Sequence, residues 1–299
     1  MTVSLGWGTY RVEEIGPAAD AVIAAGCTWI DTAPNYLGGH AHGGLAPVLR
    51  QHPEVQVSTK AGYLTKATAT AGLQAGVLSY EEADAAHSLN PDYLRWQIAR
   101  NRTELGRNRL NLMFLHNPEH ATGDPARLRA RLVDAFAVLE QAARDGEICG
   151  YGVATWHGFQ GSFTVDDLYA VALQVADGRP HHLHAIQLPV NLVQISPIVE
   201  ALNGRGPLVE AAVRELAVFA SAPLAGGELP GMITPELAAL IRPGLTRAQA
   251  SLAVVAATPG INRVLLSTRQ TAHWEQAQAV LAAEPLDELT LRKIVDVLI

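Results

Sequence analysis

The chain has 299 residues, with 22 Lys and Arg against 29 Asp and Glu, and 48% of its residues are hydrophobic while 17% are charged. This composition is typical of a folded globular protein and excludes a mainly disordered chain. At about 150 residues per domain the length suggests two domains, whereas a closed α/β barrel of roughly 250 residues is a single domain.

The net charge is −7, and basic residues are not clustered. Because phosphate groups are bound by clustered positive charge, we expect no nucleic-acid partner and no binding to a membrane surface. The longest uncharged stretches, 180–199 and 248–262, are interrupted well short of the ~20 apolar residues that a membrane span needs. The first ten residues lack a signal-peptide pattern, so we expect a cytoplasmic protein.

Two cysteines, Cys27 and Cys149, could form at most one disulfide, and neither has the spacing of a metal site. We expect both to be buried thiols.

Short apolar runs alternate with segments of helical periodicity along the whole chain. In chain order we expect strand 3–8, helix 17–25, strand 27–30, helix 45–51, strand 55–59, helix 91–105, strand 110–115, helix 128–144, strand 148–154, helix 165–176, strand 185–190, helix 207–214, strand 217–222, helix 247–257, strand 263–266, helix 271–283 and helix 287–298. Asn90 before Pro91 is a helix start, and Gly26, Gly106 and Gly146 follow helical runs, where glycine is favoured.

Eight strand-helix units predict a (β/α)8 barrel that takes up residues 1–299 as one domain, with a doubly wound sheet as the alternative. No Gly-x-Gly-x-x-Gly sequence follows a predicted strand, which disfavours a Rossmann fold. Two long connections, 61–90 and 223–245, begin where strands end, at the face of a barrel that carries active sites.

Several predicted strands close with polar residues, which converge on one mouth in a barrel. These residues are Asp31, Lys60, His116, Thr155, Gln187 and, slightly later, Asn191. Asp31 and Lys60 follow neighbouring strands and can form an ion pair, which on its own would equally fit a structural salt bridge that plugs the barrel. Tyr36 lies five residues after Asp31, close enough to bring its hydroxyl beside Lys60.

A tyrosine beside a lysine can act as an acid or a base. A nearby cation favours the phenolate, so we expect Lys60 to lower the pKa of Tyr36 from its usual value of about 10. His116 could donate a hydrogen bond to a carbonyl oxygen or share the proton. This set of residues suits carbonyl reduction, in which a hydride adds to carbon and an acid protonates oxygen.

The residues Asp31-Thr32-Ala33-Pro34-Asn35-Tyr36, Ser58-Thr59-Lys60 and Leu115-His116 resemble the motifs of the aldo/keto reductases, which are nicotinamide-dependent (β/α)8 oxidoreductases. The similarity runs nearly the full length of the chain. The resemblance implies that Tyr36 is the general acid/base, that Lys60 and His116 activate it, and that Asp31 keeps Lys60 charged.

The resemblance also implies where a nicotinamide dinucleotide would bind. The residues carried over are Gly8, Thr9, Tyr10, Thr155, Gln187, Ser221, Leu224, Gly226, Ser267, Arg269, Glu275 and Gln276. Arg269 could bind a 2′-phosphate, because a guanidinium pairs well with phosphate, and this favours NADP(H) over NAD(H). A solvated arginine is the alternative reading of Arg269.

Two strand ends depart from the family pattern. The usual Gly-Val-Ser-Asn is Gly152-Val153-Ala154-Thr155 here, and the aromatic residue that often precedes Ser-Pro-Leu in the seventh strand is missing around Ser221. Gln187 remains for the nicotinamide carboxamide, and Trp156 could compensate or simply pack. The departures suggest weaker or altered cofactor binding.

The histidine clusters 40–42 and 181–184 lack the helical spacing of zinc ligands, so no metal site is predicted. We expect histidines of surface loops, with His40 and His42 lining the substrate mouth as the alternative.

The expected protein is therefore an NAD(P)H-dependent aldo/keto reductase. Its long 61–90 connection, with Tyr63, Tyr80 and His87, is expected to cover the mouth, and the resemblance links such an insertion to small polar, sugar-like substrates. Two alternatives stay open: a nicotinamide-binding auxiliary or regulatory subunit with little turnover, and non-redox acid/base chemistry on the same barrel.

Overall fold

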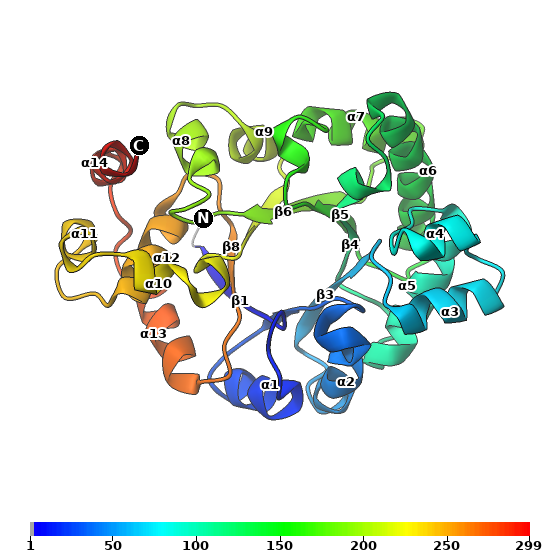
Figure 1. Ribbon diagram of the computed structural model, residues 1–299, viewed down its shortest axis with the longest axis horizontal. Coiled ribbons are helices and arrows are strands. Elements are labelled where there is room, and N and C mark those ends of the chain that lie inside the picture. The colour runs from blue at the N-terminus through cyan, green and yellow to red at the C-terminus, as the bar shows by residue number, and fades with distance from the viewer. Residues whose placement is uncertain (1–2) are drawn as a thin grey trace.

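A computed structural model, which describes residues 3–299, shows eight parallel strands closed into a barrel in the order β1-β2-β3-β4-β5-β6-β7-β8. The strands are β1 (Ser4–Gly8), β2 (Trp29–Asp31), β3 (Gln56–Ala61), β4 (Leu112–His116), β5 (Tyr151–Ala154), β6 (Leu183–Pro189), β7 (Ala217–Ser221) and β8 (Arg263–Leu266). Helices surround this ring of strands (Figure 1). The (β/α)8 prediction is confirmed, and the doubly wound alternative is wrong.

The helices follow the strands as the alternating pattern predicts. They are α1 (Ile15–Ala24), α2 (Ala41–Gln51), α3 (Lys66–Gln74), α4 (Tyr80–Asp84), α5 (Pro91–Leu105), α6 (Pro125–Arg144), α7 (Val165–Ala176), α8 (Ser196–Leu202), α9 (Pro207–Val213), α10 (Leu229–Met232), α11 (Pro235–Ile241), α12 (Arg247–Ala257), α13 (Thr271–Ala282) and α14 (Glu288–Leu298). Four short 3₁₀ helices, η1 (Tyr36–Gly39), η2 (Pro118–Ala121), η3 (Gly158–Gln160) and η4 (Ala225–Gly227), lie in connections that follow strands.

The period of two along each strand decides which side chains enter the barrel. One buried cluster fills the interior and consists of Trp29, Leu112, Phe114, Ala154, Ala185, Phe219 and Leu265. Asp31, His116 and Gln187 each lie two residues beyond a member of this cluster and therefore face the same interior. The odd-numbered neighbours in β4, Met113 and Leu115, pack outward under the helices. The alternation of side chains along each strand thus places polar groups at the carboxyl end of a barrel with an apolar interior.

The two long connections contain helices that the sequence analysis missed. The 61–90 segment holds α3 and α4, and the 223–245 segment holds η4, α10 and α11. The two sets lie on opposite sides of the ring (Figure 1). The short α8 was also missed. These helices are short or carry little apolar periodicity, which hides them from a periodicity argument.

Within residues 3–299, no helix combines the length and the apolar composition needed to cross a membrane. Cys27 is buried, as expected, whereas Cys149 is only partly buried, and both are free thiols.

Candidate active site

A cavity of about 660 Å³ opens at the carboxyl ends of the strands. Asp31, Tyr36 and His116 line it, and so do residues that follow β1, β5, β6, β7 and β8. Lys60 lies beneath the lining, with 1% of its surface exposed. The structure therefore brings the four predicted catalytic residues together at one mouth.

The Asp31 and Lys60 side chains form a buried ion pair. The Lys60 ammonium Nζ donates to Asp31 Oδ2 at 2.6 Å and to the Thr32 carbonyl oxygen at 3.0 Å. Burial by itself would lower the pKa of Lys60 and is the largest single cause, but the interactions with Asp31 and Tyr36 together outweigh it, and the pKa is raised from its ordinary value of 10.5. Lys60 is therefore a fixed positive charge below Tyr36 at neutral pH.

The Tyr36 ring lies directly against this charge. Lys60 Nζ is 5.0 Å from the Tyr36 ring centroid, and the His116 ring lies edge-on at 6.0 Å between centroids. Desolvation raises the pKa of Tyr36 above 10, and the positive charge of Lys60 offsets this only in part. The predicted lowering of the Tyr36 pKa is wrong for this structure, because loss of water outweighs the nearby cation. Tyr36 is a protonated phenol at neutral pH.

His116 is an uncharged imidazole. Desolvation, followed by repulsion from Lys60, lowers its pKa well below 6.5. His87 Nε2 lies 2.9 Å from the His116 carbonyl oxygen and must donate to it, and the Tyr63 ring packs edge-on against the His116 ring with centroids 4.8 Å apart. These two residues brace His116 and do not line the cavity, and Tyr80 is 85% exposed. The expectation that all three cover the mouth is wrong.

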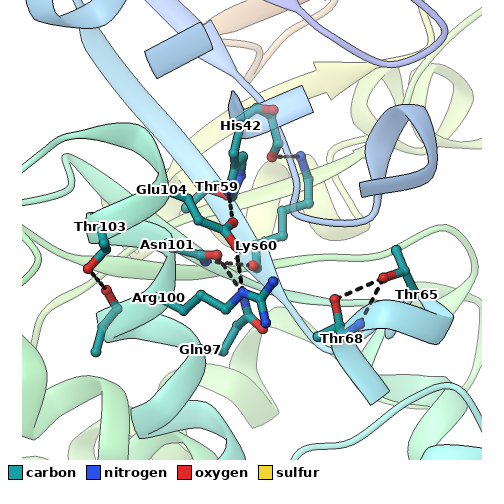
Figure 2. Close-up of polar contacts among 12 residues, drawn as sticks. His42, Thr59, Lys60, Thr65, Thr68, Gln97, Arg100, Asn101, Thr103 and Glu104 are labelled. Atoms are coloured by element: carbon teal, nitrogen blue, oxygen red, sulfur yellow. Dashed lines mark hydrogen bonds and ion pairs between the residues drawn. The ribbon is translucent and has the colours of Figure 1, made fainter. Parts of the chain in front are cut away.

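A second group of polar side chains contacts β3 from the helix side, around Lys60 (Figure 2). Asn101 Nδ2 donates to the Lys60 carbonyl oxygen at 3.0 Å. His42 Nε2 lies 3.0 Å from Thr59 Oγ1, and its Nδ1 lies 3.0 Å from Glu104 Oε2. His42 is 1% exposed, so its assignment to a surface loop or to the substrate mouth is wrong. The two hydrogen bonds satisfy both ring nitrogens of this buried histidine and link α2 to β3 and α5.

The end of β5 is held by a glutamate that the sequence analysis did not single out. Glu119 Oε1 accepts hydrogen bonds from Thr155 Oγ1 at 2.6 Å and from the backbone N–H groups of Trp156 and His157. Thr155 Oγ1 in turn accepts from the Gly158 N–H at 2.6 Å. The Thr155 hydroxyl proton is thus already used within the protein. Trp156 lines the cavity with 42% of its surface exposed.

Most of the residues predicted to bind a dinucleotide line the cavity. They are Gly8, Tyr10, Thr155, Gln187, Ser221, Leu224, Gly226, Ser267 and Arg269. The buried Gln187 Nε2 has no hydrogen-bond partner among the described residues, so it is a free amide donor in the cavity wall. Such a donor fits the carbonyl oxygen of a carboxamide.

Three predicted cofactor residues lie elsewhere. Thr9 is fully buried, and its hydroxyl donates to Thr32 Oγ1 at 2.9 Å. Glu275 and Gln276 are exposed on α13 and do not line the cavity. The structure does not bring these three to the cavity, and their cofactor role stays a prediction.

Charged groups at the rim include Arg269, whose guanidinium Nη1 lies 3.6 Å from Glu13 Oε2, with both side chains largely exposed. Within the described residues 3–299, no group of three or more His, Cys, Asp and Glu side chains is placed to hold a metal ion.

The buried histidines predict how stability depends on pH. Desolvation is the main cause that lowers the pKa values of His42, His87 and His116 from 6.5. The unfolded chain therefore binds more protons than the folded protein below about 6.5, and stability falls as the pH drops through that range. We expect the Tm to decrease from pH 7 to pH 5, with a shallower slope in His42→Gln. The exposed His40→Gln is the matched control, and an equal change of slope in both variants would contradict the assignment.

Residues 1–239 match the model of the aldo/keto reductase family. A D-threo-aldose 1-dehydrogenase from Pseudomonas sp. is 28% identical over 169 residues, which cover 51% of this chain and 50% of the relative. The match thus spans about half the length of this curated relative.

Solved structures share the fold over nearly the whole chain. An aldo/keto reductase from Klebsiella pneumoniae, in complex with NADP and acetate, has a TM-score of 0.68 at 19% identity and covers 99% of this chain and 94% of its own. A glycerol dehydrogenase from Gluconobacter oxydans has a TM-score of 0.70 at 16% identity and covers 98% of this chain and 90% of its own.

Proposed function

The chain belongs to the aldo/keto reductase family, and on that premise we propose that it is an NADP(H)-dependent oxidoreductase that interconverts a carbonyl and an alcohol on a small, sugar-like substrate. One observation carries the proposal: a protonated Tyr36, a charged Lys60 paired with Asp31, and a neutral His116 meet at the wall of one cavity.

In carbonyl reduction, each residue of the site has a separate role. Gln187 holds the carboxamide of a nicotinamide through its free amide donor. When bound, the reduced dinucleotide supplies a hydride for the carbonyl carbon of the substrate. Tyr36 gives its phenolic proton to the carbonyl oxygen, and the Lys60 charge stabilises the phenolate that remains. His116 donates a hydrogen bond to the same oxygen and orients the carbonyl.

The relative and the rim of the cavity both support the proposed substrate class. The curated relative is named for oxidation of aldoses. In this chain the exposed face of Trp156 lies at the rim of a cavity whose wall also carries Asn117 and Gln194. An aromatic face beside amide groups suits a polyhydroxylated substrate, which presents both C–H and O–H groups.

A binding titration with NADPH and NADH, followed by assays on a panel of aldoses and aldehydes, tests the proposal. Tight cofactor binding with turnover of an aldose or aldehyde supports it. Binding without turnover would favour the auxiliary-subunit alternative, and failure to bind either dinucleotide would favour non-redox acid/base chemistry.

The preference for NADPH is assigned to Arg269. Its guanidinium is largely exposed at the rim, and its ion pair with the exposed Glu13 spans 3.6 Å, so it is available to pair with a 2′-phosphate. We expect Arg269→Ala to weaken NADPH binding about tenfold and to leave NADH binding unchanged, because one charge-assisted hydrogen-bonded contact is lost. Arg205→Ala, at an exposed arginine between α8 and α9, is the control. Equal loss for both cofactors would contradict the role of Arg269.

A further inference from the structure

The barrel interior contains a polar contact that adjoins the catalytic ion pair. Ser58 lies opposite Asp31 in the register of β2 and β3, and it is fully buried. Trp29 belongs to the apolar cluster that fills the barrel. Neither residue lines the cavity, and neither has a role in the mechanism above. A buried hydroxyl in an apolar interior is costly unless its hydrogen bonds are made.

The direction of each hydrogen bond in this contact is determined by chemistry. Trp29 Nε1 can only donate, and it lies 3.0 Å from Ser58 Oγ, which therefore accepts. Ser58 has a single hydroxyl proton, and its Oγ lies 2.7 Å from Asp31 Oδ1, which can only accept as a carboxylate. Asp31 Oδ2 is then left for Lys60. The three side chains form a one-way chain of donors that ends at the carboxylate.

The start of this chain is itself held in place. The Arg263 guanidinium lies over the Trp29 ring at 4.1 Å from its centroid, and the Phe219 ring packs against the same indole at 5.4 Å. These contacts pack the indole in the orientation that points its N–H at Ser58.

We propose that Ser58 and Trp29 are positioning residues, which hold the Asp31 carboxylate in the orientation that places the Lys60 ammonium beneath Tyr36. The proposal rests on the proposed function for its kinetic consequence, but not for its structural one. Ser58 fixes one carboxylate oxygen by donating a hydrogen bond to it. Trp29 acts only through Ser58: its N–H donates to the Ser58 oxygen and so orients the hydroxyl proton toward Asp31.

A double-mutant cycle measures this dependence. Ser58→Ala removes the donor to Asp31, and Trp29→Phe removes the N–H together with one ring of the indole while it keeps an aromatic face for Arg263. We expect kcat to fall about tenfold in Ser58→Ala and about threefold in Trp29→Phe, with KM within about twofold, because a hydrogen bond to a charged group is lost. The double variant should match Ser58→Ala, since within the described residues the hydrogen bonds link the Trp29 N–H to Asp31 through the Ser58 hydroxyl. Effects that multiply in the double variant would overturn the proposal.

A second measurement does not depend on turnover. The chain has only three lysines, Lys60, Lys66 and Lys293, so each ammonium gives a separate signal in a protein labelled with ¹⁵N-lysine. Lys60, held by Asp31 and Thr32, should show the slowest exchange of its ammonium protons with water. We expect that exchange to become about tenfold faster in Ser58→Ala and to change less in Trp29→Phe, while the other two lysines stay constant.

Ser251→Ala is the matched control. Ser251 is also a fully buried serine, but it lies on α12 and donates to the Arg247 carbonyl oxygen. This variant should lose stability without any change in kcat or in the exchange of Lys60. Unchanged Lys60 exchange in Ser58→Ala, or an equal change in Ser251→Ala, would overturn the proposal.

The two claims fail separately. If the wild-type protein turns over no substrate, the proposed function is wrong, and the exchange of the Lys60 ammonium still decides the role of Ser58. If Ser58→Ala does not fold, Trp29→Phe provides the test, and unchanged Lys60 exchange in that variant would overturn the proposal.

Discussion

Tyr36→Phe should reduce kcat for carbonyl reduction by about 10²- to 10⁴-fold, the usual contribution of a positioned proton donor. The substitution removes one oxygen and keeps the ring, so the contacts with Lys60, His116 and Tyr10 remain. Cofactor binding and the Tm should therefore stay close to the wild-type values. Steady-state kinetics, a dinucleotide titration and thermal unfolding measure the three quantities.

Tyr93→Phe is the control for this substitution. Tyr93 is fully buried on α5, outside the cavity, and its hydroxyl has no hydrogen-bond partner among the described residues. Its removal should leave kcat unchanged. If Tyr36→Phe keeps more than a tenth of the wild-type kcat, the proton comes from another group, and the assignment of Tyr36 is wrong.

The state of Tyr36 also predicts the pH dependence of reduction. Its raised pKa keeps the phenol protonated throughout the neutral range, so the proton needed for reduction is present before substrate binds. We expect kcat for reduction to stay level through neutral pH and to fall only as the pH rises past the ordinary tyrosine value of 10. The opposite reaction needs the phenolate and should improve as the pH rises.

Strand alternation explains why the catalytic residues could be predicted from the sequence. Asp31, Lys60 and His116 each end a short apolar run, and a period of two places their side chains inside a parallel barrel at its carboxyl end. Tyr36 follows Asp31 by one short turn. The role of these four residues could be predicted because the alternation along each strand and the topology of the barrel place them at the same end.

Residues that act through long-range partners left no such pattern. Ser58 and Glu119 are single polar residues whose importance depends on Asp31 and Thr155, which come near only when neighbouring strands pair. The burial of His42 depends on Glu104, 62 residues later. No spacing rule connects such pairs.

Some missed features did have a local signal. Ser79 and Glu82 form a capping box at the start of α4, and Thr65 caps α3 through the Thr68 N–H. The Ser-x-x-Glu spacing is a recognised helix start, so the sequence could have predicted α4. The helices of the 61–90 connection carry little apolar periodicity, so a periodicity argument does not reveal them.

Lys60→Met should destabilise the fold by about 3–5 kcal/mol, because it leaves the Asp31 carboxylate buried without its partner. The pair is 1% and 6% exposed, so little water can reach the carboxylate to replace the ammonium. The double variant Asp31→Asn/Lys60→Met removes both charges and keeps an oxygen that accepts from Ser58, and most of the stability should return. Urea unfolding measures this recovery, while turnover should stay absent in both variants.

An exposed ion pair supplies the control for this experiment. Arg205 pairs with Glu200 at a largely exposed position, and Arg205→Met should change stability by less than about 1 kcal/mol. The raised pKa of Lys60 adds a pH signature: the folded protein holds this proton more tightly than the unfolded chain, so the wild type loses stability as the pH rises past 10.5. The Lys60→Met variant should not show this decrease in stability at high pH. If it is as stable as Arg205→Met, or if the double variant recovers nothing, Asp31 does not depend on Lys60 for its charge, and the electrostatic basis assigned to Tyr36 is wrong.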